Sequence, residues 1–377
     1  MSRGLVLTGG GARAAYQVGV LKGIASILPR SVYNPFPIIC GTSAGAINAL
    51  SIAGRAGPFR LRIRKLEAIW QELRASDVYR ADFLGVSANA FHVMASFLHS
   101  GYGIGRPISL LDNTPLRQLL DSYVKFDYLD TAVSNGELEA IAISAMSYAS
   151  GQSVTFFQGQ TEIDQWKRAR RRGERTRLSI DHLMASTAIP SLFPAVKLSD
   201  GYYGDGAVRQ LKPISPALHM GAKQLLIIGV SDNATASEVQ PTEHHSPSIA
   251  QIVGHMFNSA FIDSVESDLE TLESINRLAN ALPESLRANN GITDLNPVDV
   301  LSISPSKSID SIAQEHIHEL PSSLKLFLKI TGATAQGGGT SAASYLLFEP
   351  GFCRKLIDLG YRDALAKQTA IQDFFQS

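Results

Sequence analysis

The amino-acid sequence predicts an α/β fold in which helices cover both faces of a parallel sheet. The first part of the chain repeats one pattern, an apolar strand followed by a glycine turn and a helix. These segments occupy residues 3–8, 9–11 and 12–28, and then 37–40, 41–45 and 46–54. Strands that alternate with helices at this spacing are typical of parallel sheets with helices on both sides.

Further apolar runs rich in β-branched residues add strands to the predicted sheet. They lie at residues 138–145, 153–157, 224–230 and 298–303. Residues of this type favour strands because they pack well on a pleated surface. We therefore expect the sheet to extend well beyond its first two strands.

The pattern changes to helix in the last third of the chain. Ser246-Pro247 is a good cap and first position for a helix, and apolar residues then recur every three or four positions as far as Phe261. Residues 331–344 contain consecutive glycines and predict a loop. Residues 345–374 predict one or two closing helices, broken near Pro350.

The chain of 377 residues is long enough for one large domain or two ordinary ones. Because the helical pattern follows the strand-rich part, we expect a core at residues 1–230. A mostly helical C-terminal region at 231–377 is expected to pack on this core. It contributes one further strand near 298–303.

Composition excludes several classes of function. The 34 basic residues balance 34 acidic residues, so the overall charge does not indicate nucleic-acid binding. The two cysteines, Cys40 and Cys353, lie far apart in the sequence and predict neither a disulfide framework nor a zinc cluster. The N-terminus enters structure without a signal-peptide pattern, so we expect a cytoplasmic location. The oligomeric state is not predicted.

The segment Gly41-Thr42-Ser43-Ala44-Gly45 predicts a nucleophilic serine. It follows the apolar run 37–40 and precedes a helix of small residues. Glycines on either side of Ser43 allow the tight turn that exposes a serine hydroxyl at a helix N-terminus. A nucleophilic serine also needs a base and donors for the oxyanion.

The glycines Gly9, Gly10 and Gly11 are the candidate oxyanion donors. They follow the first predicted strand and begin a helix, so their N–H groups converge at a positive helix end. A nucleotide-phosphate loop is the competing interpretation, but the endings typical of those loops are missing. Arg13 either assists the site through its charge or holds the loop by pairing with a carboxylate.

Asp205 is the candidate base. It lies between two glycines in Gly204-Asp205-Gly206, a setting that brings backbone close to whatever the carboxylate contacts. Asp-Gly alone is weak support, because the same pair is common in hairpin turns. The assignment of Asp205 as the base gains support from the glycine loop and the Ser43 turn.

Together, Gly9 to Arg13, Gly41 to Gly45 and Asp205 to Ala207 resemble the motifs of the patatin-like phospholipase family. The block 185–194, Ala-Ser-Thr-Ala-Ile-Pro-Ser-Leu-Phe-Pro, also looks like the segment that precedes the aspartate motif in that family. The resemblance implies a three-layer sandwich with a mainly parallel central sheet. It covers the chain from about residue 3 to residue 230.

The resemblance also implies a chemistry. Ser43 would be the nucleophile and Asp205 the general base, while Gly9, Gly10, Gly11 and Arg13 would form the oxyanion hole. The chain would then hydrolyse carboxylic esters of phospholipids or lysophospholipids through an acyl-enzyme, with no metal or cofactor. A conventional triad that uses His182 or His219 is the mechanistic alternative. A general esterase or thioesterase, or a lipid-binding scaffold without turnover, are the functional alternatives.

Two segments suggest contact with lipid. Residues 83–105 contain no Asp, Glu, Lys or Arg and carry several aromatic side chains. We interpret them as a hydrophobic flap or a helical layer over the sheet rather than a membrane span, because polar residues interrupt them. Residues 167–172 are strongly basic, which is typical of a solvated loop or helix face and also suits peripheral contact with an anionic membrane.

Overall fold

The computed structural model describes residues 2–80, 109–231, 264–282, 296–330 and 339–376, together with isolated positions between 252 and 259. The predicted flap at 83–105 lies outside the described residues. So does most of the predicted helix that begins at Ser246. The remaining ranges contain the sheet, the helices on both of its faces and all the motifs.

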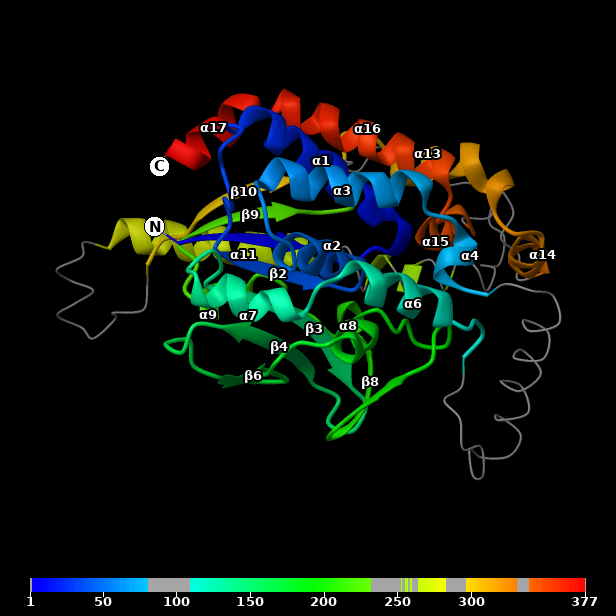
Figure 1. Ribbon diagram of the computed structural model, residues 1–377, viewed down its shortest axis with the longest axis horizontal. Coiled ribbons are helices and arrows are strands. Elements are labelled where there is room, and N and C mark those ends of the chain that lie inside the picture. The colour runs from blue at the N-terminus through cyan, green and yellow to red at the C-terminus, as the bar shows by residue number, and fades with distance from the viewer. Residues whose placement is uncertain are drawn as a thin grey trace.

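The described residues contain one sheet of ten strands (Figure 1). The strands follow the order β10-β9-β1-β2-β3-β4-β6-β5, and β8 pairs with both β3 and β7. Their bounds are β1 (Arg3–Leu7), β2 (Ile38–Thr42), β3 (Ala140–Ser147), β4 (Ser153–Gly159), β5 (Trp166–Arg168), β6 (Arg171–Arg175), β7 (Val196–Leu198), β8 (Gly201–Asp205), β9 (Gln224–Ile228) and β10 (Asp299–Ile303).

The sheet is parallel from β10 to β3 and mixed beyond β3. Strand β4 pairs antiparallel with β3 in register from Ala140–Gly159 to Met146–Ser153. Strand β8 also runs antiparallel to β3. The short connection between β3 and β4 explains the change, because a parallel pair needs a much longer crossover. The prediction of a mainly parallel sheet is therefore confirmed, with an antiparallel extension.

The helices include those predicted at 12–28, 46–54 and 345–374, and several others. Their bounds are α1 (Ala15–Ile27), α2 (Ala44–Ala53), α3 (Phe59–Glu72), α4 (Ala75–Val78), α6 (Thr114–Tyr123), α7 (Asp127–Ser134), α8 (Ile180–Ser186), α9 (Ser215–His219), α11 (Ser264–Ala281), α13 (Ile309–His316), α14 (Ser322–Ile330), α15 (Gly339–Leu346), α16 (Pro350–Ala366) and α17 (Gln368–Gln376). Short 3₁₀ turns lie at Gly11–Ala14, Gly206–Val208 and Ile317–Glu319.

Helices cover both faces of the sheet, which confirms the predicted three-layer fold. On β1, Leu5 and Leu7 pack into the cluster formed with α1, α2, α3 and α16, whereas Val6 packs into a second cluster with α9 and α11. Alternate residues of a strand point to opposite faces, so one short strand contributes to both layers. Figure 1 shows α16 running alongside α1 over the first face.

Two predictions about local structure are wrong. The basic run 167–172 is not a loop or a helix face as a whole, because it forms the antiparallel hairpin β5–β6, in which Lys167 pairs with Arg172 and residues 169–170 make the turn. The predicted loop at 331–344 is helical from Gly339 onward, as α15. The closing helices are confirmed, and Pro350 begins α16 at the first helical turn, where a missing N–H is harmless.

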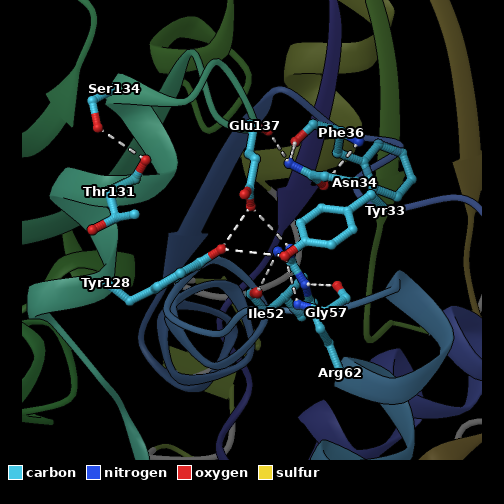
Figure 2. A network of polar contacts seen from close by, with 10 residues as sticks. All are labelled: Tyr33, Asn34, Phe36, Ile52, Gly57, Arg62, Tyr128, Thr131, Ser134 and Glu137. Atoms are coloured by element: carbon cyan, nitrogen blue, oxygen red, sulfur yellow. Dashed lines mark hydrogen bonds and ion pairs between the residues drawn. The ribbon is translucent and has the colours of Figure 1, made fainter.

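A polar network closes the end of the sheet at which β2 and β3 begin (Figure 2). Arg62 is fully buried and donates to the carbonyl oxygens of Gly57 and Ile52 and to the carboxylate of Glu137. Tyr128 also donates to this carboxylate, at 2.8 Å. Since Glu137 precedes β3 and Arg62 lies on α3, the network joins a helical layer to the sheet. It lies where β2 and β3 begin, whereas Ser43 lies where β2 ends.

No helix within the described ranges is long and apolar enough to cross a bilayer.

Candidate active site

Ser43 lies on a sharp turn between β2 and α2. Its backbone has φ 55° and ψ −127°, a conformation that a residue with a side chain rarely adopts and that costs about 1–3 kcal/mol. Gly41 and Gly45 make the turn possible. A Cβ at Gly41 would collide with the backbone of Gly45 and Ala46, and a Cβ at Gly45 would collide with the carbonyl oxygen of Leu7.

Asp205 reaches the same point from the end of β8. The Ser43 hydroxyl donates to Asp205 Oδ2 at 2.5 Å, and the N–H of Ala207 donates to Oδ1 at 2.9 Å. Gly206 has no room for a side chain, because a Cβ there would collide with the carbonyl oxygen of Ser144. The structure therefore brings together two residues that lie 162 positions apart in the sequence.

The carboxyl group of Asp205 is completely buried. Burial raises the pKa of Asp205 to about 7, although the hydrogen bonds from Ser43 and from the N–H of Ala207 lower it. Desolvation disfavours the charged form of a carboxyl group, which is the direction that makes it a better base. A base whose pKa lies near neutral pH accepts a proton more readily than an exposed aspartate.

The block 185–194 connects the two side chains. Ser186 is fully buried; its hydroxyl accepts a hydrogen bond from the N–H of Ser43 at 3.0 Å and donates to the carbonyl of Ser144 at 2.6 Å. Two residues later, the carbonyl of Ala188 accepts from the N–H of Asp205 at 2.8 Å. In the sequence, this block was recognised only by its resemblance to the family. The structure shows that its backbone and Ser186 hold Ser43 and Asp205 in position.

Gly10 and Gly11 begin the turn that leads into α1. No hydrogen bond joins the N–H groups of Gly10 and Gly11 to another described residue, so these groups are the candidate oxyanion donors. Gly11 has φ 54° and lies against the backbone of Tyr345, where a Cβ would collide with the carbonyl oxygen. The loop can therefore contain only glycine at this position. Gly9 precedes this pair and is buried with it.

Arg13 contacts the C-terminal region rather than Ser43 or Asp205. It is 2% exposed, and its guanidinium donates to Ser344 Oγ at 2.7 Å and to Asp310 Oδ1 at 2.5 Å. The same group lies 4.2 Å from the centre of the Tyr345 ring, a favourable cation–π arrangement. Of the two roles considered for Arg13, the geometry favours holding the loop through a carboxylate.

A chain of buried side chains fixes the start of the glycine loop, and no local sequence pattern indicated it. Gln17 donates to the carbonyl of Thr8 at 2.8 Å and accepts from Asn48 at 2.9 Å. Asn48 in turn accepts from the indole N–H of Trp70 at 2.9 Å. This chain joins α1, α2 and α3 to the end of β1.

An apolar pocket extends from Ser43. It is lined by Gly11, Ser43, Ala44, Ile47, Ser51, Leu66, Ile69, Trp70, Leu73, Val78, Leu116, Leu119, Leu120, Tyr123, Thr187, Ile189, Phe193 and Phe348. The described lining contains no charged side chain, so the pocket suits a hydrocarbon chain rather than a polar group. Ser43, the candidate nucleophile, and Gly11, from the candidate oxyanion loop, both line this pocket.

The two histidines considered for a triad bond elsewhere. His182 contacts Ser179 through Nδ1 at 2.8 Å, and its ring packs on Phe156. His219 stacks on Trp166 and contacts the carbonyl of Ser215. Burial lowers the pKa of both rings. In the described part of the chain, Asp205 alone is hydrogen-bonded to the Ser43 hydroxyl.

Comparison with known proteins places these features in a family. The family model described as "Patatin-like phospholipase" matches residues 5–218. A "cGAMP-activated phospholipase" of Pseudomonas aeruginosa (strain BWHPSA011 / Pa011) is 24% identical over 208 residues, which are 54% of this chain and 52% of that protein. The match thus spans about half the length of this relative. The crystal structure of VipD from Legionella pneumophila aligns with 98% of this chain and 67% of its own, at 11% identity and a TM-score of 0.38.

Proposed function

The chain belongs to the patatin-like phospholipase family, and from this premise we propose that it is a serine hydrolase of acyl lipids. Ser43 is the nucleophile and Asp205 is the general base. The observation that carries the proposal is the 2.5 Å hydrogen bond to the buried Asp205 carboxylate from the hydroxyl of Ser43, which lines an apolar pocket. A nucleophile and its base within hydrogen-bonding distance are the minimum that acyl transfer requires.

The reaction begins when Ser43 Oγ attacks the ester carbonyl carbon and its proton passes to Asp205. The N–H groups of Gly10 and Gly11 donate to the oxyanion, and Gly9 and Arg13 hold the loop that presents them. The tetrahedral intermediate then releases the alcohol, which takes the proton from Asp205. Water next attacks the acyl-enzyme and gives its proton to Asp205. Collapse of this second intermediate releases the fatty acid and returns the proton to Ser43.

Two features of the site support this mechanism. The strained backbone of Ser43 is maintained by glycines and by Ser186, so the hydroxyl keeps one orientation. The raised pKa of Asp205 reduces the mismatch between a carboxylate base and a serine proton. Together they supply the orientation and basicity that a histidine provides in a triad.

The substrate is an ester of a long acyl chain. The apolar pocket at Ser43 accommodates a hydrocarbon chain, and the family relationship favours phospholipids or lysophospholipids. The Pseudomonas relative is itself named as a phospholipase. Peripheral contact with a lipid surface follows from such a substrate. Glycerides, other esters and thioesters are distinguished by the assay below.

The test is reaction with a long-chain fluorophosphonate, followed by intact mass measurement. We expect one adduct per chain in the native protein and in a Ser134→Ala control, a serine on the surface of α7, and none in Ser43→Ala. A panel of lipids, with the released fatty acids and lysolipids identified by mass, then assigns the substrate class. The proposal is wrong if the folded native protein forms no adduct and releases no fatty acid.

A further inference from the structure

A second cavity lies between the basic hairpin β5–β6 and the segment that follows Asp205. Its walls include Arg170 and Arg171 from the hairpin, Arg209 and Lys212 from the later segment, and Ser153 and Thr155 from β4. It shares no lining residue with the apolar pocket at Ser43. The proposed hydrolysis therefore does not account for it.

The cavity carries an excess of positive charge. Its described lining includes no carboxylate, and of the four cations only Lys212 has an ion-pair partner among the described residues, Asp268 at 3.1 Å. Within the described ranges, Arg209 donates to the carbonyl of Gly151, at 3.0 Å, and to no carboxylate. Guanidinium groups stay protonated at any physiological pH, so this charge is permanent.

Arg171 shows that the cavity lacks a partner for its donors. The Nε atom of Arg171 is buried and has no hydrogen-bond partner. Buried donors are almost always paired, and an unpaired charged donor is the most costly kind.

We propose that this cavity binds a phosphate group. A guanidinium presents N–H donors in a planar fork that matches two phosphate oxygens, and Arg171 and Arg209 approach the cavity from different segments. The hydroxyls of Ser153 and Thr155 supply further donors of the kind that phosphate oxygens accept. The phosphate is either a lipid headgroup or part of a free compound.

The cavity also contacts the segment that carries the nucleophile. Gln210 lines the cavity, donates to Ser144 at 2.9 Å and accepts from the hydroxyl of Thr42 at 2.5 Å. Thr42 directly precedes Ser43. An occupied cavity would thus lie one side chain away from the turn that holds Ser43.

The test is calorimetric titration of the full chain with inorganic pyrophosphate. We expect one binding site per chain, weakened at least about tenfold in Arg171→Gln and in Arg209→Gln. Lys167→Gln removes an equal charge from the same hairpin outside the cavity, and it should bind as the native chain does. The two variants lie on separate segments, so a local folding defect in one of them would not explain weaker binding in both. Circular dichroism checks that each variant is folded.

Vesicles distinguish the two sources of the phosphate. The Ser43→Ala variant, which cannot hydrolyse the lipid, is sedimented with phosphatidylcholine vesicles that do or do not contain phosphatidic acid. Binding that requires phosphatidic acid and Arg171, and that pyrophosphate displaces, identifies a headgroup site. If vesicle binding does not depend on Arg171 while pyrophosphate binding does, the natural ligand is a free phosphate compound rather than a lipid headgroup. The site does not exist if pyrophosphate fails to bind, or if Lys167→Gln weakens binding as much as Arg171→Gln.

Discussion

If Asp205 is the general base, as we propose, it sets how activity depends on pH. Burial raises its pKa to about 7, and only the ionised carboxylate can accept the proton of Ser43. We therefore expect kcat/KM for an uncharged, soluble ester to be level above pH 7 and to fall about tenfold for each pH unit below it. Initial rates between pH 5 and pH 9 measure this profile. A profile that stays flat down to pH 5 would exclude Asp205 as the base with this pKa.

The same burial makes Asp205 a source of instability. Its pKa is higher in the folded chain than its ordinary value of 3.8, so ionisation opposes folding increasingly as pH rises from about 4 to 7. Asp205→Asn removes this penalty and can still pair with Ser43 and Ala207. We expect it to raise the free energy of unfolding by up to about 4 kcal/mol at pH 8 and by progressively less towards pH 4.

Activity and stability should therefore change in opposite directions in this variant. Loss of the general base should lower kcat by about 10² to 10⁴, while thermal unfolding at pH 8 moves to higher temperature. The pair of measurements is informative together, because a variant that was merely misfolded would lose both. An unchanged unfolding temperature at pH 8 would mean that the carboxylate is not desolvated.

Helix α15 holds the glycine loop through Arg13. Arg13→Met removes the contacts to Ser344 and Asp310 and frees the loop, while Asp310→Ala removes the carboxylate and leaves the guanidinium in place. We expect both changes to lower kcat by about 10- to 100-fold with little change in KM, because small displacements of positioning groups are costly. A direct electrostatic role of Arg13 predicts a different result: Asp310→Ala would leave kcat unchanged or raise it.

The Arg62 network joins α3 to α2 and to the segment before β3 (Figure 2). Arg62→Met leaves the carbonyl groups of Ile52 and Gly57 without their donor and removes the ion-pair partner of Glu137. We expect a loss of about 3–5 kcal/mol in the free energy of unfolding, with kcat of the folded protein unchanged. Arg64→Met, an exposed arginine on the same helix, serves as the control. A fall in kcat equal to that of a catalytic variant would show that the two ends of the sheet are coupled.

Local signals determined which elements could be predicted from the sequence. The strand, glycine turn and helix around Ser43 were correct because each depends on residues a few positions apart. Strands β5 and β6 were missed because arginines occupy positions where an apolar alternation would reveal a strand. The start of α15 was missed because Gly339 ends a run of three glycines that is typical of loops, whereas the helix packs against the distant Arg13 through Tyr345.

The candidate site was predictable as a set of residue types and not as a geometry. The glycines, Ser43 and Asp205 were identified in the sequence, and the structure places Ser43 and Asp205 in contact. The contact between Arg13 and Asp310 joins positions 297 residues apart, and no local pattern indicates such a pair. Ser186 and Gln17 were missed for the same reason, since the role of a buried polar side chain depends on partners that are distant in the sequence.

The C-terminal region completes the fold around the first 230 residues. Strand β10 pairs with β9 over five residues, and α16 lies along α1. Glycines allow this close approach: a Cβ at Gly19 would collide with the carbonyl oxygen of Ile357, and a Cβ at Gly360 with that of Tyr16. The hydroxyl of Tyr16 donates to Asp363 at 2.9 Å. The predicted division at residue 230 therefore separates segments that share one sheet and one core.

A chain that ends at residue 230 should consequently not fold by itself. It would expose the buried α1 surface that α16 covers, the unpaired edge of β9 and the guanidinium of Arg13 without Asp310. Exposed apolar surface and an open strand edge both favour aggregation. We expect this fragment to be insoluble or to unfold without cooperativity, and to recover a cooperative transition when it is produced together with residues 231–377. Cooperative unfolding of the fragment alone, with ester hydrolysis, would instead establish residues 1–230 as an independent catalytic domain.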